Sequence, residues 1–140
     1  MITISTDKSK LDIATIHRFL STSYWAESIP VEVVRKSIEH SLCFGVYDDG
    51  NQIGFARVIS DFATFAYLAD VFILESHRGL GLSKLLMREI MDHPDLQGLR
   101  RFALMTRDAH GLYRRFGFKE ASRPDYQMEI VRPGIYKQGK

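Results

Sequence analysis

Apolar residues along this chain recur with two periods, one typical of helices and the other typical of strands. Ile13, Ile16 and Leu20 lie at helical spacing and predict a helix that faces a core with one side. Similar patterns recur in later segments, and Pro30 and His93-Pro94 mark a helix start and a helix end. The predicted helices cover residues 10–21, 30–40, 82–92 and 110–116, and the predicted strands cover residues 2–5, 42–47, 52–60, 64–74, 101–106 and 126–131.

The order of these elements predicts an α+β fold. Asp48-Asp49-Gly50-Asn51 is a strong turn signal between two predicted strands and indicates a hairpin. Three antiparallel strands then lead into a strand–helix–strand–helix–strand unit. We therefore expect a mixed, mainly antiparallel central sheet with helices on both faces.

Length and composition predict a single domain over residues 1–140. With 140 residues, 45% of them hydrophobic, the chain can bury one core and not two. No apolar run reaches the roughly 18 residues that span a bilayer, and the first residues do not resemble a secretory signal. The lone cysteine suits a reducing compartment. We expect a cytoplasmic protein without a membrane partner.

The segment 71–84 carries the most specific chemical signal. A predicted strand ends at Leu74, and the sequence RGLGLS from Arg78 to Ser83 opens directly into a predicted helix. The first amides of a helix lack intrahelical partners, the helix dipole favours negative charge there, and glycine lets a ligand approach the backbone. Arg78 adds a permanent cation. This combination predicts a pyrophosphate site.

Glycine spacing distinguishes three kinds of phosphate loop. The dinucleotide fingerprint G-x-G-x-x-G fails because Lys84 stands at the third glycine, and the P-loop spacing does not occur. The pattern [RQ]-x-x-G-x-[GA] is met at Arg78 and Gly81 and departs only at Ser83, which is small. The segment resembles motif A of the GNAT superfamily of acyl-CoA-dependent N-acetyltransferases. The structural alternative is a glycine-bearing turn before an ordinary helix.

A second segment resembles the same superfamily. Residues 109–118, AHGLYRRFGF, are similar to its signature A-x-x-x-Y-x-x-x-G-F, with Tyr113 at the tyrosine and Gly117 suited to ending a helix. Both signatures occur in the order and at the spacing of the superfamily, and the resemblance covers about residues 53–118.

The resemblance implies that acetyl-CoA lies between two strands that separate, at 67–74 and 101–106. Main-chain groups near Phe72 and Ile73 would pair with the pantetheine arm, and Thr106 stands where the family often has an asparagine that contacts this arm. Tyr113 would protonate the departing thiolate; the alternative is a tyrosine that only packs its ring. The pyrophosphate would be held by Arg78, Gly79, Leu80, Gly81, Leu82 and Ser83.

Asp70 is the candidate for the base that accepts a proton from the amine. It lies inside a predicted strand, where an ionisable group is costly unless it is paired or used in chemistry. Many members of the family have an acid or a held water on this strand, and an ion pair with Arg57 is the alternative. Tyr24 and Trp25 follow the first predicted helix, where the family builds its acceptor pocket; they either line this pocket or fill the core.

Charge is distributed unevenly along the chain. Residues 1–77 contain 6 Lys and Arg against 10 Asp and Glu, whereas residues 78–119 contain 9 against 4. The basic part would suit the phosphates of coenzyme A and the acidic part a cationic amine, and scattered solvated charge is the alternative. The net charge of +2 and the lack of a basic run argue against a nucleic-acid partner.

Other catalytic chemistry finds little support in the sequence. Cys43 lies in an apolar strand and is expected to be a small buried side chain. His77, His93 and His110 lack metal-ligand spacing, so no metal site is expected, and no G-x-S-x-G segment indicates a serine hydrolase.

We expect an N-acetyltransferase that moves an acetyl group from acetyl-CoA directly to a primary amine of a small molecule or peptide. The alternatives are a non-catalytic acyl-CoA-binding or interaction domain of the same fold, and transfer to a protein or aminoacyl-RNA. A homodimer is left open by the sequence.

Overall fold

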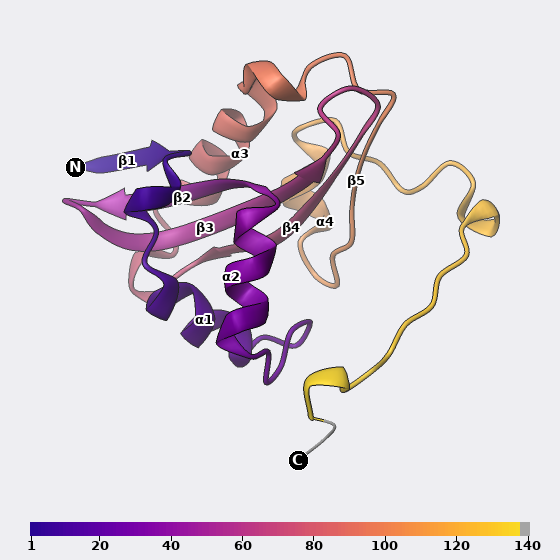
Figure 1. The fold of residues 1–140 in the computed structure, drawn as a ribbon. Coiled ribbons are helices and arrows are strands. Elements are labelled where there is room, and N and C mark those ends of the chain that lie inside the picture. Colours follow the sequence, from indigo (N-terminus) through magenta and orange to yellow (C-terminus); the bar gives the residue numbers. More distant parts are fainter. Residues whose placement is uncertain (138–140) are drawn as a thin grey trace.

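A five-stranded sheet forms the centre of the structure, a computed structural model that describes residues 1–137 (Figure 1). No helix in this described part is long and apolar enough to cross a bilayer. The strands are β1 (Ile2–Ser5), β2 (Leu42–Asp48), β3 (Asn51–Ser60), β4 (Phe65–Ile73) and β5 (Arg101–Leu104), and the helices are α1 (Ile13–Ser21), α2 (Val31–Glu39), α3 (Leu82–Asp92) and α4 (His110–Arg114).

The strands lie in the sheet in the order in which they occur in the chain. Pairing is antiparallel from β1 to β4, and β4 and β5 are parallel. The β2–β3 hairpin turns at Asp49 and Gly50, whose φ angles of 48° and 88° match the twist of a tight hairpin turn. A parallel pair needs a crossover connection, and α3 lies within the one that joins β4 to β5.

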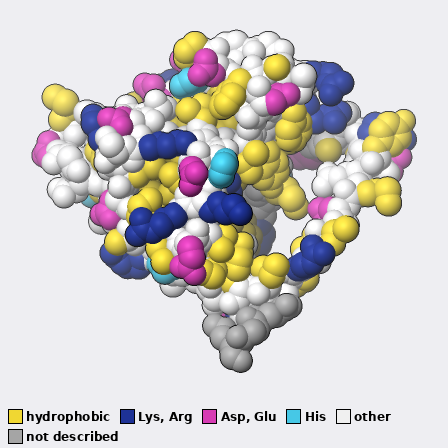
Figure 2. Space-filling model, viewed as in Figure 1, with side chains coloured by type: hydrophobic (Ala, Val, Ile, Leu, Met, Phe, Trp, Pro, Cys, Tyr) yellow, Lys and Arg dark blue, Asp and Glu magenta, His cyan; other side chains and the backbone are white. Residues whose placement is uncertain are grey.

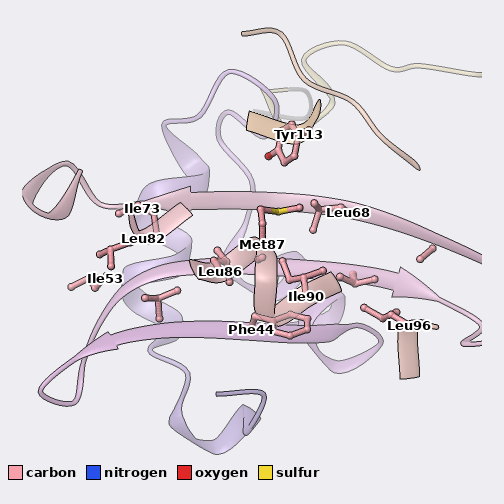
Figure 3. Packing of buried hydrophobic residues seen from close by; sticks show 14 residues of the cluster. Phe44, Ile53, Leu68, Ile73, Leu82, Leu86, Met87, Ile90, Leu96 and Tyr113 are labelled. Carbon is pink, nitrogen blue, oxygen red and sulfur yellow. The ribbon is translucent and has the colours of Figure 1, made fainter. Parts of the chain in front are cut away.

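Helices cover both faces of the sheet and bury two apolar clusters. On one face α3 contributes Leu86, Met87 and Ile90, which pack against side chains of β2, β3 and β4 (Figure 3). On the other face α1 and α2 bury Ile16 and Val34 among their neighbours. The expected mixed sheet with helices on both faces is confirmed.

The strand predicted at residues 126–131 is absent, so that prediction was wrong for the single chain. Residues 119–137, which we call the C-terminal arm, stand off the body and leave an opening beside it (Figures 1 and 2). The arm returns at Tyr136, which packs beside the α1 and α2 cluster, and Lys137 forms an ion pair with Glu27. An alternating segment becomes a strand only beside a partner strand, and this chain does not bring one to it.

Several elements are shorter than predicted, and α1 begins at Ile13 instead of residue 10. β5 ends at Leu104 instead of residue 106, and α4 ends at Arg114 instead of residue 116. After β5 the chain turns into α4, and the Thr106 hydroxyl accepts a hydrogen bond from the Ala109 amide at 3.0 Å in this turn. The turn leads the chain away from β4.

Candidate active site

β4 and β5 run side by side for only part of their length. Residues 65–68 of β4 pair with residues 101–104 of β5. From residue 69 to 73, β4 continues with β3 as its only partner among the described residues. The strands therefore separate, as expected, and Phe72 and Ile73 lie on the unpaired stretch. An extended ligand can add to such an edge through main-chain hydrogen bonds.

A bulge interrupts this stretch at Asp70. The register between β3 and β4 shifts between Phe55 and Arg57, so that Asp70 and Val71 together oppose Ala56. The φ angle of Asp70 is 57°, a left-handed value that is uncommon for a residue with a side chain. Such bulges redirect a side chain, and they are frequent beside active sites.

The Asp70 carboxylate accepts hydrogen bonds with both of its oxygens. Oδ2 accepts from Arg57 Nε at 2.8 Å, and Oδ1 accepts from the indole nitrogen of Trp25 at 2.9 Å. Arg57 also donates to the Ser41 hydroxyl at 3.2 Å. The side chains of Asp70 and Arg57 are only 10% and 16% exposed. The ion pair considered as an alternative is confirmed, and this geometry suits a carboxylate that positions Trp25.

The turn after β4 and the first residues of α3 form a hollow with unpaired backbone amides. Gly79 and Gly81 have φ angles of 80° and 76°, which glycine adopts without strain. The amide of Leu85 makes the first intrahelical bond, to Gly81, so the amides of residues 82–84 lack intrahelical partners. No side chain caps this helix start.

These donors, at the positive end of the helix dipole, fit a phosphate group. The hollow has a volume of about 210 Å³, and its lining residues are Ile73, His77, Arg78, Gly79, Gly81, Leu82, Ser83, Lys84 and Leu112. Leu80 of the expected set is not among them, and its side chain is exposed.

Charged groups are fixed around the hollow. Arg78 Nε donates to the carbonyl of Ile73 at 3.0 Å, which holds the guanidinium at the end of β4. His77 Nε2 lies 2.9 Å from Asp48 Oδ2, and its Nδ1 lies 2.8 Å from the Ser76 hydroxyl. The hydrogen bond from His77 is the main reason why the pKa of Asp48 is lowered. These contacts attach the turn between β4 and α3 to β2 and β4.

Tyr113 lies on α4 and is buried in the same cluster as α3 (Figure 3). Its ring packs edge-on against Phe118, with ring centroids 6.1 Å apart. Burial raises the pKa of Tyr113, and the nearby charges of Tyr24 and Asp108 raise it further. The phenol is therefore protonated at neutral pH and able to donate. Its role as a proton donor stays a prediction.

Tyr24 and Trp25 lie in the loop between α1 and α2. They are 51% and 43% exposed, which excludes the alternative that they fill the core. The Arg107 guanidinium lies 3.8 Å from the Tyr24 ring centroid, and the Arg107 amide donates to the Tyr24 hydroxyl at 3.3 Å. The loop before α2 therefore touches the loop after β5. The role of Tyr24 and Trp25 in binding an acceptor stays a prediction.

Sequence reasoning missed Phe19 and Arg107. The Phe19 ring stacks on Phe72 with centroids 4.0 Å apart, and it also approaches Trp25 at 6.2 Å. Phe19 belongs to the apolar pattern of a predicted helix, whereas no local pattern distinguishes Arg107, whose contact spans 83 residues. Both contacts arise only when distant segments are brought together.

Cys43 and Thr106, which were also considered above, lie in β2 and at the start of α4. Burial raises the pKa of the Cys43 thiol to about 11, so the reactive thiolate is scarce at neutral pH. The Thr106 hydroxyl is engaged at the start of α4, and its expected contact with a ligand stays a prediction. Among residues 1–137, acidic, histidine and cysteine side chains form no group of three that could hold a metal ion.

The mixed sheet, with α3 in the connection between β4 and β5, has the fold of the GNAT acetyltransferases. Residues 12–118 match the model of the Acetyltransferase (GNAT) family, so most of the chain, including both signatures, is covered. The chain belongs to this family.

Known relatives agree with this membership. A protein of Xanthomonas campestris pv. campestris, assigned to the GNAT acetyltransferases, shares 58% sequence identity with this chain. Its crystal structure matches this one with a TM-score of 0.95, and the match covers 97% of this chain and 96% of that one. A protein of Gibberella zeae assigned as an acetyltransferase is 30% identical over 84% of this chain and 78% of its own. A structure from Clostridium acetobutylicum, solved with acetyl-CoA, shares the fold with a TM-score of 0.69 and 13% sequence identity. This match covers 94% of this chain and 96% of that one.

Proposed function

We propose that this protein is an acetyl-CoA-dependent N-acetyltransferase that acts on a primary amine within a ternary complex. One observation carries the proposal: the unpaired stretch of β4 and the uncapped start of α3 meet at Ile73. Ile73 ends β4 and also lines the hollow at the helix start. A ligand with an extended amide chain joined to a pyrophosphate fits both features at once.

This arrangement gives the bound molecule a direction. The pyrophosphate would lie at the amides of residues 82–84 with Arg78, and the pantetheine would run back along residues 69–73. The thioester would then lie toward the bulge, where Asp70 holds Trp25. The Clostridium acetobutylicum relative, which was solved with acetyl-CoA on the same fold, supports this choice of acyl donor.

The transfer needs three events. The amine nitrogen attacks the thioester carbonyl carbon, and a carbon–nitrogen bond forms while the carbonyl oxygen becomes an oxyanion. The oxyanion collapses, the carbon–sulfur bond breaks, and the thiolate leaves. Tyr113 would give its phenol proton to this thiolate and regain a proton from solvent. Burial raises the pKa of Tyr113, so the phenol carries its proton at neutral pH, as a donor must, and is a weaker acid than a free tyrosine.

The attacking amine must also lose a proton. Asp70 is the candidate acceptor on β4, although both of its oxygens already hold donors. Solvent water beside the exposed Tyr24 and Trp25 is the other acceptor that the geometry offers. A primary amine of a small molecule or a peptide suits a surface with two exposed aromatic rings next to the Asp70 carboxylate.

The test is amine-dependent release of free thiol from acetyl-CoA, measured over a panel of primary amines. We expect release that saturates with both substrates and yields the N-acetylated amine by mass spectrometry. Binding of acetyl-CoA without release for any amine would instead support a non-catalytic acyl-CoA-binding domain. Absence of binding would reject both functions.

A further inference from the structure

Arg107 carries a positive charge that has no partner of opposite charge. Its guanidinium lies 3.8 Å from the Tyr24 ring centroid, and its main-chain amide donates to the Tyr24 hydroxyl at 3.3 Å. Among residues 1–137 this guanidinium forms no ion pair and donates no hydrogen bond, although Asp108 is its neighbour in the chain. The ring contact therefore fixes the position of an exposed cation whose donors are free.

Two aromatic rings connect Arg107 to the bulge of β4. The Tyr24 ring packs edge-on against the Trp25 ring, with centroids 5.0 Å apart. The indole nitrogen of Trp25 donates to Asp70 Oδ1 at 2.9 Å. Arg107 is thus tied to the end of β4 where the thioester of the proposed complex lies. It is not among the residues that line the hollow at the start of α3, where the pyrophosphate is placed.

Stacking on a ring leaves a guanidinium free to bind an anion. The N–H groups of arginine point outward in its own plane, so a ring against its face does not block them. These donors match the two oxygens of a carboxylate or a phosphate. Contact with the ring also restricts the side chain before any ligand arrives, which lowers the entropy cost of binding.

The charges around the bulge leave Arg107 as the unmatched group. The Asp70 carboxylate is paired with Arg57 Nε at 2.8 Å, and both side chains are largely buried. Arg107 and the Tyr24 ring above which it lies are exposed. A neutral acceptor would leave this cation with solvent alone, whereas an acceptor with a negative group would pair with it.

We propose that the acceptor is a primary amine that also carries a carboxylate or a phosphate, and that Arg107 binds this anionic group. The inference rests on the proposed function, because it assigns the acceptor of that reaction. The amine would lie toward the bulge, and the carbon chain between the two charges would lie along the rings of Tyr24 and Trp25. The anionic group then orients the amine for attack on the thioester.

Selectivity between matched amines tests this proposal. Each ω-amino acid with a chain of two to six carbons is compared with its carboxamide, and 2-aminoethyl phosphate is compared with ethanolamine. We expect kcat/KM of the best anionic amine to exceed that of its neutral partner at least about tenfold, the usual value of a charge-assisted hydrogen bond. The better of the carboxylate and phosphate series identifies the anion.

Variants assign this selectivity to one side chain. Arg107→Gln should abolish the preference for the anionic amine while KM for acetyl-CoA stays the same. Arg101→Gln, which removes another exposed cation after β4, should keep the preference. Equal kcat/KM for the paired amines in the wild type, or a preference that survives Arg107→Gln, would overturn the proposal and leave the acetyltransferase function intact.

Side-chain NMR gives a readout that does not require turnover. The Nε–Hε signal of Arg107, assigned by its loss in Arg107→Gln, is followed in ¹⁵N-labelled protein with coenzyme A bound. We expect a saturable shift with 4-aminobutyrate or 2-aminoethyl phosphate, and none with the carboxamide or ethanolamine. If no amine is acetylated, the proposed function fails, and this titration still decides whether Arg107 binds an anion. A signal that neither anionic amine shifts would overturn the proposal.

Discussion

Tyr113 combines a buried ring with the phenol proton that the proposed mechanism uses. The ring packs against Phe118, and burial raises the pKa of the phenol above the usual value of 10. The protonated phenol therefore persists at neutral and mildly alkaline pH. We expect ionisation of this phenol to reduce activity only above pH 10.

Replacing Tyr113 by Phe keeps the ring and removes the proton. We expect turnover to fall by roughly 10²–10⁴-fold, with the smaller loss favoured because thiolate is a tolerable leaving group. Acetyl-CoA affinity and melting temperature should change little. Steady-state kinetics and calorimetry measure these effects, and Tyr126→Phe on the exposed arm serves as the matched control. Undiminished turnover in the folded Tyr113→Phe variant removes this residue from the mechanism.

Asp70 has two possible roles, either to position Trp25 or to accept the proton of the amine, and the variant Asp70→Asn distinguishes them. Asn keeps the shape and tolerates the φ angle of 57°, but it leaves the Arg57 guanidinium without its charged partner. We expect a stability loss of about 1–3 kcal/mol in urea denaturation, as for a buried group that loses a partner. Turnover should fall by less than about tenfold, because a positioning group contributes less than the roughly 10² or more of a general base.

The pH profile of Asp70→Asn distinguishes the two roles. If the carboxylate takes the amine proton, turnover drops by at least about 10² and recovers at alkaline pH as the amine loses its proton unaided. A drop that does not depend on pH indicates positioning of Trp25 instead.

At the scale of elements, the start of α3 is the proposed phosphate site. Arg78→Ala removes a charge-assisted hydrogen bond to phosphate and should weaken acetyl-CoA binding roughly ten- to a hundredfold. Arg88→Ala, an exposed cation further along α3, should change it little. Acetylpantetheine, which lacks the pyrophosphate, should bind the wild type and Arg78→Ala equally. Equal calorimetric affinity of both proteins for acetyl-CoA would reject Arg78 as a phosphate ligand.

The start of α1 gives a stability prediction with a defined dependence on pH. The Asp12 carboxylate accepts hydrogen bonds from the amide and the hydroxyl of Thr15, and these bonds lower the pKa of Asp12 below 3.8. A lowered folded-state pKa means that this stability is present above about pH 4 and is lost as pH falls through the folded value.

Asp12→Ala should therefore cost about 1 kcal/mol at pH 7 and less in acid, as expected for a lost helix cap. Asp12→Asn keeps a capping side chain that cannot ionise, so its stability should depend less on acid than that of the wild type. Urea denaturation between pH 7 and pH 3 checks both variants, and an equal loss for Ala at both pH values would contradict the account.

At the scale of the whole molecule, the sequence predicted those elements and turns that depend on local patterns of residues. Apolar spacing located the four helices and the first five strands, and glycine spacing located the turn before α3, because each depends on neighbouring residues. The contact of Tyr24 with Arg107 and the bulge at Asp70 depend on segments that meet only in the folded sheet. The arm shows the opposite case, since residues 126–131 have the local pattern of a strand and lack the partner that would make them one.

The central claim is that acetyl-CoA lies along β4 and ends at the start of α3. Titration of acetyl-CoA into ¹⁵N-labelled protein, followed by amide chemical shifts, tests it most directly. We predict the largest changes at residues 69–73 and 79–85, with α2 nearly unchanged. Changes centred on other elements, or none at millimolar acetyl-CoA, would contradict the account.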